Sequence, residues 1–199
     1  IAAPAYEGIP VTHRGVATSF TVVTGHEDPA KPAEQTDWAA LAAVPGTLII
    51  LMGMGRLAGI TERLIAGGRP ADQPAAAVQW GTTPRQRRLI STLGDLPEAV
   101  SAAGLGSPAV VVVGPVAALA SSIGWLERRP LLGKRIVVTR SRLQASALSE
   151  RLRNLGAEVI ELPAIRIAAL PEGPAEAALI ESAPARSHLV FTSVNGVDE

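Results

Sequence analysis

The sequence predicts an α/β fold, because short apolar runs with strand character alternate with segments of helical periodicity. Hydrophobic residues make up 47% of the 199 residues, which supplies a buried core and excludes an intrinsically disordered chain. Lys and Arg number 18, as do Asp and Glu, and this zero net charge argues against a dedicated nucleic-acid-binding protein. The absence of cysteine excludes a disulfide scaffold, a cysteine-ligated metal centre and a thiol nucleophile.

The chain shows neither a membrane span nor a targeting segment. Its longest apolar runs, Leu48–Met52 and Ala109–Val113, are far shorter than the roughly 20 residues that cross a bilayer. The first residue is Ile1, and no basic region followed by an apolar one marks a signal peptide. The chain ends at Glu199, directly after a strand-and-turn pattern. We therefore interpret it as an internal piece of a longer cytoplasmic polypeptide with no membrane partner.

Strands and helices alternate along the first part of the chain. Strands are expected at Ser19–Thr24, Thr47–Met52, Ala75–Gln79 and Ala109–Val113. Residues 29–37 are polar and contain two prolines, which predicts a loop, and Asp37 can cap a short helix that runs through Ala43. Apolar residues at helical spacing predict a helix over Leu57–Ile65, closed by Gly67 and Gly68. A further segment begins at Thr82-Thr83-Pro84, with Leu93, Leu96 and Val100 on its later apolar side.

A change in composition near residue 128 indicates a domain boundary. Two arginines, a proline and a glycine stand between apolar patterns, so we expect domains over residues 1–127 and 134–199, joined by a linker at 128–133. The second domain opens with a predicted βαβ unit made of Arg135–Thr139, Gln144–Leu155 and Glu158–Leu162. A third strand is expected at Leu189–Thr192.

Glycine turns follow several of these strands, where α/β sheets bind ligands. The turns are Met52-Gly53-Met54-Gly55, Trp80-Gly81-Thr82-Thr83 and Gly114-Pro115, and tight chain reversal is the commoner explanation of any one such turn. The histidines His13, His26 and His188 are not spaced as metal ligands on one helix, so no metal site is expected. Arg85, Arg87 and Arg88 form a basic cluster, as do Arg128, Arg129, Lys134 and Arg135, and each is a solvated face or an anion site.

Five strings stand in order along about residues 1–127. They are Tyr6-Glu7-Gly8-Ile9-Pro10-Val11-Thr12-His13-Arg14, Phe20-Thr21-Val22-Val23-Thr24-Gly25-His26, Leu48-Ile49-Ile50-Leu51-Met52-Gly53, Gly81-Thr82-Thr83-Pro84-Arg85-Gln86-Arg87, and Val111-Val112-Val113-Gly114 with Trp125 beyond. These strings resemble uroporphyrinogen-III C-methyltransferases, and their order and spacing match the C-terminal half of that family. The resemblance implies two α/β domains with S-adenosyl-L-methionine in the cleft between them, of which this chain holds the C-terminal one.

The family methylates uroporphyrinogen III at C2 and C7, giving precorrin-2 for sirohaem and cobalamin. By match of motif, Met52, Gly81 and Ala109 are expected to contact the cofactor. The substrate carries eight carboxylates, so the basic side chains of His13, Arg14, Arg85 and Arg87 are candidates to hold it. No catalytic acid or base is assigned within the chain. By resemblance, the methylase part is expected to form a homodimer.

Residues 134–199 resemble the start of uroporphyrinogen-III synthases, through Gly133-Lys134-Arg135-Ile136-Val137-Val138-Thr139-Arg140, Leu155-Gly156-Ala157-Glu158-Val159 and Phe191-Thr192-Ser193-Val194-Asn195-Gly196-Val197. This implies a partial Rossmann-like or flavodoxin-like α/β domain, from an enzyme that cyclises hydroxymethylbilane. The synthase makes the substrate of the methylase, so the order suggests a fused bifunctional protein. Weak candidates for substrate contacts are Arg140, Thr192, Ser193 and Asn195.

Two other interpretations stay open from the sequence. One is a methylase that acts on a later corrin precursor, and the other is a non-catalytic α/β ligand-binding remnant. In the bifunctional interpretation the chain alone is expected to catalyse neither reaction.

Overall fold

A computed structural model describes residues 1–26, 36–140, 142–164, 173–186, 188 and 190. The chain divides into two compact units. The first comprises Ile1–Ile136 and Arg151–Val159, and the second comprises Val137–Glu150 and Ile160–Glu199. The expected domains at residues 1–127 and 134–199 stay a prediction.

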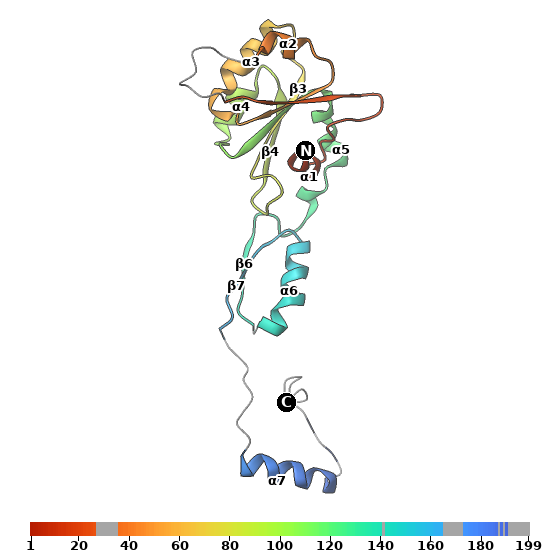
Figure 1. Cartoon of the computed structure of the whole chain (residues 1–199), viewed down its shortest axis with the longest axis vertical. Coiled ribbons are helices and arrows are strands. Elements are labelled where there is room, and N and C mark those ends of the chain that lie inside the picture. Colours follow the sequence, from red (N-terminus) through yellow and green to blue (C-terminus); the bar gives the residue numbers. More distant parts are fainter. Residues whose placement is uncertain (27–35, 141, 165–172, 187, 189, 191–199) are drawn as a thin grey trace. The chain divides into compact units, whose positions relative to one another are not determined.

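A five-stranded sheet forms the centre of the first unit (Figure 1). Its strands are β1 (Phe20–Thr24), β2 (Thr47–Leu51), β3 (Pro74–Gln79), β4 (Arg87–Thr92) and β5 (Ala109–Val113), in the order β1-β2-β5-β3-β4. β1 and β2 are parallel, and the other neighbouring pairs are antiparallel. The predicted α/β class is confirmed, with a mixed sheet.

The strand directions decide which turns meet. Because β5 is antiparallel to both β2 and β3, strands β1, β2 and β3 all run the same way. They end where β4 and β5 begin, and we call this the carboxyl end of the sheet. Gly114 and Pro115 follow β5, so they lie at the opposite end, away from the other two glycine turns. Position along the sequence did not reveal this separation.

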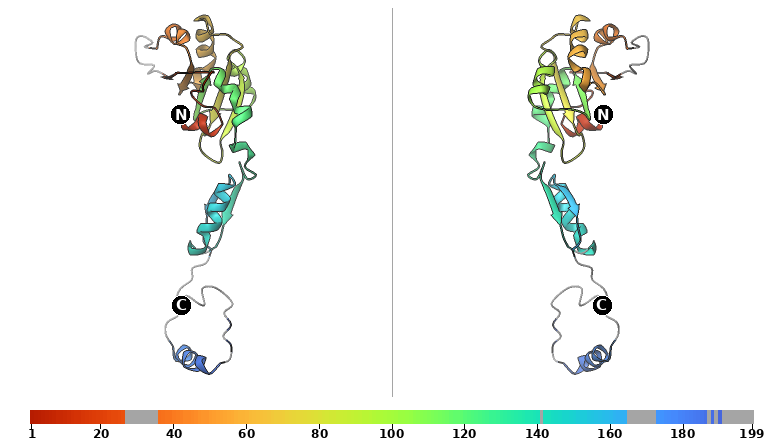
Figure 2. Two further views of the ribbon diagram at one scale, coloured as in Figure 1. Left: turned by 90° about the vertical axis from the view of Figure 1, so that its right-hand side faces the viewer. Right: turned by 90° about the vertical axis from the view of Figure 1, so that its left-hand side faces the viewer.

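Helices cover both faces of the sheet (Figures 1 and 2). On one face lie α2 (Trp38–Ala43), α3 (Leu57–Ala66) and α4 (Leu96–Ala102), and on the other lie α1 (Ala2–Tyr6), the 3-10 helix η2 (Pro115–Leu119) and α5 (Ala120–Ile123). Successive β2 side chains alternate between the two cores, since Leu48 and Ile50 pack with α3 and Ile49 packs with η2. A strand buried on both faces reads as a continuous apolar run, which explains Thr47–Leu51.

Two polar contacts fix α2. The Asp37 carboxylate accepts a hydrogen bond from the Ala40 amide at 2.9 Å, so the predicted N-cap is confirmed. At the other end, the buried Arg69 guanidinium donates to the Val44 carbonyl at 3.0 Å and to Gln73 Oε1 at 3.2 Å. This arginine satisfies a carbonyl that the helix terminus leaves without a partner.

The strand β4 was missed by the sequence analysis, which left the segment after Pro84 without a strand. Its first residues, Arg87 and Arg88, hide the alternation of a strand. In the structure Leu89 packs against the core while Ile90 is 38% exposed, which is the expected period of two. The pairing with β3 runs from Gln79 opposite Arg87 to Pro74 opposite Thr92.

The predicted βαβ segment forms. It consists of β6 (Arg135–Val138), α6 (Arg142–Asn154) and β7 (Glu158–Glu161), and its strands make a two-stranded sheet. The Glu158 amide donates to the Lys134 carbonyl and the Leu162 amide to the Val138 carbonyl, a parallel register. The remaining elements are η1 (Met54–Arg56), η3 (Leu126–Arg128), α7 (Pro174–Ser182) and η4 (Ala183–Ala185).

The expected strand at Leu189–Thr192 lies outside the described residues. Among the described helices, none has the length and apolar character needed to cross a membrane.

Candidate functional site

The three predicted cofactor-contact residues meet at the carboxyl end of the sheet. Met52 follows β2, Gly81 stands two residues after Gln79, the last residue of β3, and Ala109 opens β5. Leu51 pairs with Val110, and Gln79 pairs with Ala109. Since β2, β5 and β3 are consecutive neighbours, the three residues lie on adjacent strands although 57 positions separate Met52 from Ala109.

The backbone at this end adopts an unfavourable conformation. In the described part of the chain, positive φ at residues other than glycine occurs at Met52 (53°), Trp80 (52°) and Thr82 (70°). All three stand in the two turns after β2 and β3. Left-handed backbone at such residues costs about 1–3 kcal/mol each and concentrates at functional sites. The surrounding packing must hold these turns in place.

A pocket of 350 Å³ opens beside these turns. Its lining comprises Ala3, Val78, Trp80, Gly81, Thr83, Pro108, Ala109 and Val110. It therefore contains two of the three predicted contacts, while Met52 is 61% exposed at the same end of the sheet. The lining is apolar apart from Thr83 and backbone groups, which suits a ligand with a flat apolar part.

Gly81 is needed for packing as well as for access. A Cβ at this position would lie 2.2 Å from the Ala3 Cβ and 3.1 Å from its Cα. Since real Cβ atoms do not approach so closely, any larger residue would push α1 away from the turn. The glycine therefore brings α1 against the turn and forms one wall of the pocket.

A buried polar network that the sequence did not indicate supports the same turn. Gln86 accepts a hydrogen bond from the Thr82 amide and donates one to Glu7 Oε1. Glu7 is 2% exposed, and its Oε2 lies 3.3 Å from Arg88 Nη1. Burial raises the pKa of Glu7, against the lowering effects of the Gln86 hydrogen bond and the Arg88 charge. The network joins the segment after α1 to the turn after β3.

The arginine cluster separates into three different environments. The Arg85 guanidinium lies over the Trp80 ring, 5.0 Å from its centroid, and its Nε is 3.9 Å from Glu158 Oε1. Arg87 donates to the Ala103 carbonyl at 2.8 Å, at the end of α4. Arg88 is mostly buried, donates to the Glu7 carbonyl at 2.9 Å and pairs with Glu127. Of the three, Arg85 borders the pocket, through its contact with Trp80.

The other predicted substrate contacts are not brought to this pocket by any described interaction. His13 pairs with Ala17 in a turn that also holds Arg14, and His13 Nδ1 lies 2.9 Å from the Arg14 carbonyl oxygen. Arg140 follows β6 in the second unit and is exposed. Thr192, Ser193 and Asn195 lie outside the described residues.

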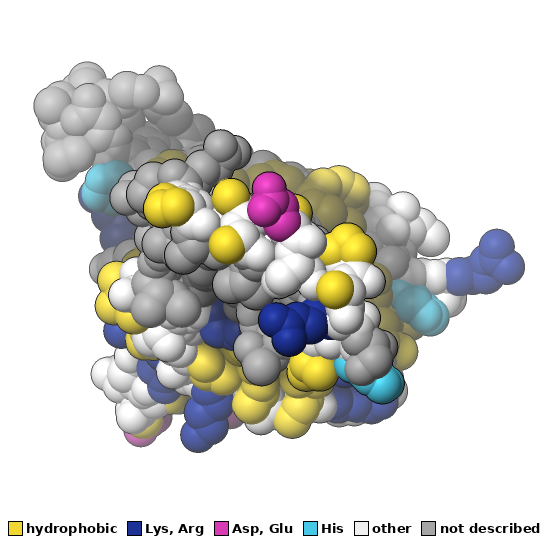
Figure 3. Space-filling model, turned by 90° about the horizontal axis from the view of Figure 1, so that it is seen from below, with side chains coloured by type: hydrophobic (Ala, Val, Ile, Leu, Met, Phe, Trp, Pro, Cys, Tyr) yellow, Lys and Arg dark blue, Asp and Glu magenta, His cyan; other side chains and the backbone are white. Residues whose placement is uncertain are grey.

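On the face shown in Figure 3, lysine and arginine side chains are scattered among hydrophobic ones. Within the part of the chain that the structure describes, no three histidine or acidic side chains come together in a way that could hold a metal ion.

Comparisons with known proteins point to the same family as the sequence motifs do. Residues 1–97 match the family of tetrapyrrole (corrin/porphyrin) methylases. The chain is 36% identical over 199 residues to a Ruminiclostridium josui protein described as porphyrin biosynthesis protein HemD, covering 99% of this chain and 39% of that protein. It is 36% identical over 171 residues to the uroporphyrinogen-III C-methyltransferase of Bacillus subtilis, covering 86% and 35%.

The description of a third relative includes the cofactor S-adenosyl-L-methionine. The chain is 41% identical over 124 residues to the S-adenosyl-L-methionine-dependent uroporphyrinogen III methyltransferase of Methanosarcina barkeri, covering 62% of this chain and 49% of that protein. The chain thus spans between 35% and 49% of the length of these three relatives.

A solved structure supports the fold. The cobalt precorrin-4 methyltransferase of cobalamin biosynthesis aligns with a TM-score of 0.52 at 21% identity, covering 58% of this chain and 48% of that one. Residues 1–97 thus match the tetrapyrrole methylase model, the fold is like that of the solved methyltransferase, and the chain is similar in sequence to uroporphyrinogen-III C-methyltransferases.

Proposed function

We propose that residues 1–127 are the C-terminal part of an S-adenosyl-L-methionine-dependent uroporphyrinogen-III C-methyltransferase, and that the carboxyl end of the sheet binds the cofactor. The observation that carries the proposal is the convergence of Met52, Gly81 and Ala109 from three adjacent strands beside a pocket of 350 Å³. The names of the relatives support the substrate and the cofactor.

The residues present fit such a cofactor. Gly81 and Ala109 leave the pocket wall close to bare backbone, so a flat adenosyl group can lie against them. The exposed Met52 presents a polarizable thioether beside the pocket mouth. When bound, the cofactor supplies an already electrophilic sulfonium methyl. This part of the chain therefore has to orient the methyl donor and the acceptor. Rigid turns after β2 and β3, with their positive-φ residues, suit that role.

The substrate side of the proposal names uroporphyrinogen III as methyl acceptor at C2 and C7, with precorrin-2 as product. Arg85 is the best placed of the predicted carboxylate contacts, because it stacks on the pocket-lining Trp80. Arg87 has its guanidinium engaged at the end of α4. His13 and Arg14 stay candidates from their motif. Homodimer formation likewise stays a proposal.

Calorimetric titration with S-adenosylhomocysteine tests the cofactor site. Ala109 lines the pocket, so replacing it by Leu enlarges a lining residue without touching Gly81, and we expect the affinity to fall at least tenfold. Ala118→Leu is the matched control, because Ala118 is exposed on η2, which follows the opposite end of β5. Gly81 variants are unsuitable because they displace α1. If the two leucine variants bound S-adenosylhomocysteine with equal affinity, the pocket would not be the cofactor site.

We further propose that the chain continues into a uroporphyrinogen-III synthase part that cyclises hydroxymethylbilane. The parallel β6-α6-β7 segment supports this, together with the match of the whole chain to the Ruminiclostridium josui porphyrin biosynthesis protein. Because the chain spans less than half of its relatives, we expect it to form neither precorrin-2 nor uroporphyrinogen III by itself. Assays of both products with the isolated chain check this expectation.

A further inference from the structure

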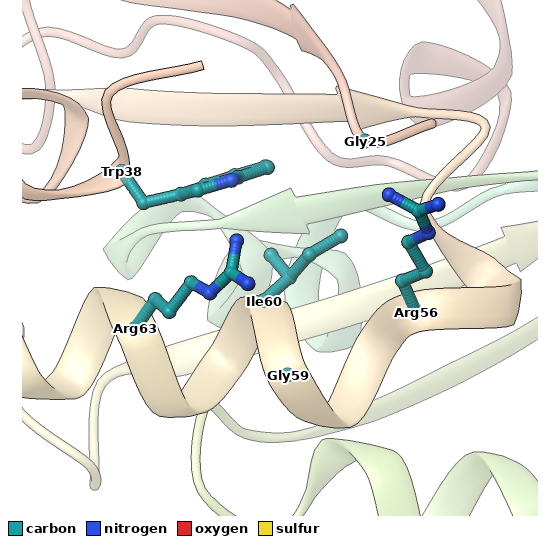
Figure 4. Close-up of a pocket in the computed structure, with 6 residues that line it drawn as sticks. All are labelled: Gly25, Trp38, Arg56, Gly59, Ile60 and Arg63. Carbon is teal, nitrogen blue, oxygen red and sulfur yellow. The ribbon is translucent and has the colours of Figure 1, made fainter. Parts of the chain in front are cut away.

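A second pocket, of 310 Å³, lies beside α3 in the same unit (Figure 4). Its lining comprises Gly25, Trp38, Arg56, Gly59, Ile60 and Arg63. Trp38 and Ile60 belong to the core on the α3 face, whereas Val78 and Val110 of the first pocket belong to the core on the η2 face. The two pockets therefore lie on opposite faces of the sheet.

The second pocket is adjacent to Met52. Gly25 directly follows β1, and its amide donates to the carbonyl of Leu51, the residue before Met52, at 2.7 Å. A Cβ on Gly25 would lie 2.7 Å from the Gly53 Cα and 2.8 Å from Ile60 Cδ1. The glycine thus permits close packing of the chain after β1 against the chain after β2. One end of the pocket is consequently at the carboxyl end of the sheet, where the first pocket also opens.

The chemistry of the lining is that of an anion site with an apolar wall. Arg56 ends η1 and Arg63 lies in α3, and in Figure 4 both side chains rise from the same side of this segment. In Figure 4 the Arg63 guanidinium points toward the indole of Trp38 and that of Arg56 extends toward Gly25. Among the described residues that line the pocket none is acidic, and no described carboxylate lies within ion-pair distance of Arg56.

Gly59 leaves the floor of this pocket open. A Cβ at Gly59 would meet no described atom within 4 Å, so packing does not require a glycine there. Glycine nevertheless destabilises a helix relative to alanine. A glycine at position 59 is explained if the space between Arg56 and Arg63 holds a ligand.

We propose that this second pocket binds acid side chains of the tetrapyrrole substrate, with Arg56 pairing with a carboxylate and Trp38 and Ile60 contacting its apolar part. The proposal rests on the function proposed above. Uroporphyrinogen carries eight carboxylates, two on each pyrrole ring, and the ring that is methylated must approach Met52. A planar guanidinium fork matches a carboxylate in bidentate geometry. A volume of 310 Å³ is at the lower end for ligand sites, so it suits one ring with its acid arms rather than the macrocycle.

Titration of the full chain with uroporphyrin III, the stable oxidised form of the macrocycle, tests this pocket through the change in porphyrin fluorescence. Loss of one charge-assisted pair predicts about tenfold weaker binding by Arg56→Gln. Arg128→Gln, which removes an exposed guanidinium on η3, is the matched control and should bind as the unsubstituted chain does.

A second pair of variants tests the space rather than the charge. Gly59→Leu fills the pocket with a good helix former, and Ala58→Leu adds the same side chain at a neighbouring exposed position that does not line the pocket. We expect weaker uroporphyrin binding for Gly59→Leu alone. The unfolding free energy of Gly59→Leu should be at or above that of the unsubstituted chain, and that of Ala58→Leu should be close to it.

The outcomes distinguish a failure of this inference from a failure of the proposed cofactor site. Weaker uroporphyrin binding by Arg56→Gln and Gly59→Leu, with unchanged S-adenosylhomocysteine affinity, supports the pocket as a substrate subsite. Equal uroporphyrin affinity of variants and controls, or no saturable binding by the unsubstituted chain, overturns it while leaving the calorimetric result for Ala109→Leu intact. A loss of S-adenosylhomocysteine affinity in Arg56→Gln instead assigns the pocket to the cofactor and also overturns the inference.

Discussion

Glu7 is a buried carboxylate whose contacts hold the turn that carries Gly81. It pairs with Arg88 and accepts a hydrogen bond from Gln86, which in turn accepts from the Thr82 amide. A buried charged group is stabilising only if such partners are present. At the scale of single residues, the position of the proposed cofactor contact therefore depends on side chains from the other end of the methylase-like segment.

The pH dependence of stability tests the role of Glu7. Its pKa is raised on folding by burial, so the folded state holds the Glu7 proton more tightly than the unfolded state does. The contribution of Glu7 is then greatest below the unfolded pKa of about 4.3 and is lost as pH rises through the folded pKa. The stability difference between the unsubstituted chain and Glu7→Gln should fall as pH rises from 4.5 to 7.5, as urea denaturation at several pH values can measure. A difference that grows with pH contradicts this account.

Sequence reasoning reached some site residues and missed others for a physical reason. Met52 and Gly81 stand in turns after apolar strands, and with Ala109 they were assigned through the family resemblance. Glu7 and Gln86 are 79 positions apart, and nothing in either local pattern predicts their contact. Arg88 was grouped with Arg87 by adjacency, although the alternation of β4 places their side chains on opposite faces.

At the scale of elements, α2 is a short helix whose stability depends on its two ends. Its six residues are too few to be helical in isolation, so the Asp37 cap and the Arg69 contacts at its C-terminal side must hold it. Asp37 was recognisable from sequence because a cap is local. Arg69 was not, since its carbonyl partner at Val44 is 25 positions away.

Removing the Arg69 contacts should loosen α2 and with it the wall formed by Trp38. Arg69→Met keeps much of the aliphatic stem but leaves the Val44 carbonyl without its donor, and we expect a loss of about 1.5–3 kcal/mol in unfolding free energy. Arg128→Met, at an exposed position, should change stability by no more than about 0.5 kcal/mol. Chemical denaturation measures the unfolding free energies of both variants. If Arg69→Met and Arg128→Met were equally stable, Arg69 would not anchor the helix.

At the scale of the whole molecule, the mixed sheet brings two pockets to one end of the first unit. Alternation of apolar runs predicted the α/β class and most of the strands, because hydrophobic period is a local property. It could not predict strand order or direction, which depend on contacts between distant segments. Those two properties place Ala109 between Met52 and Gly81 and move Gly114 to the opposite end.

The most direct test of the central claim is to map S-adenosylhomocysteine on the chain by amide chemical-shift changes in NMR spectra. The account predicts saturable changes concentrated at Met52, Trp80, Gly81 and Ala109, at the carboxyl end of the sheet. Gly46 and Gly114, at the opposite end, serve as internal controls and should not shift. Changes centred on those glycines, or no saturable change anywhere in the described residues, would contradict the assignment of the cofactor site.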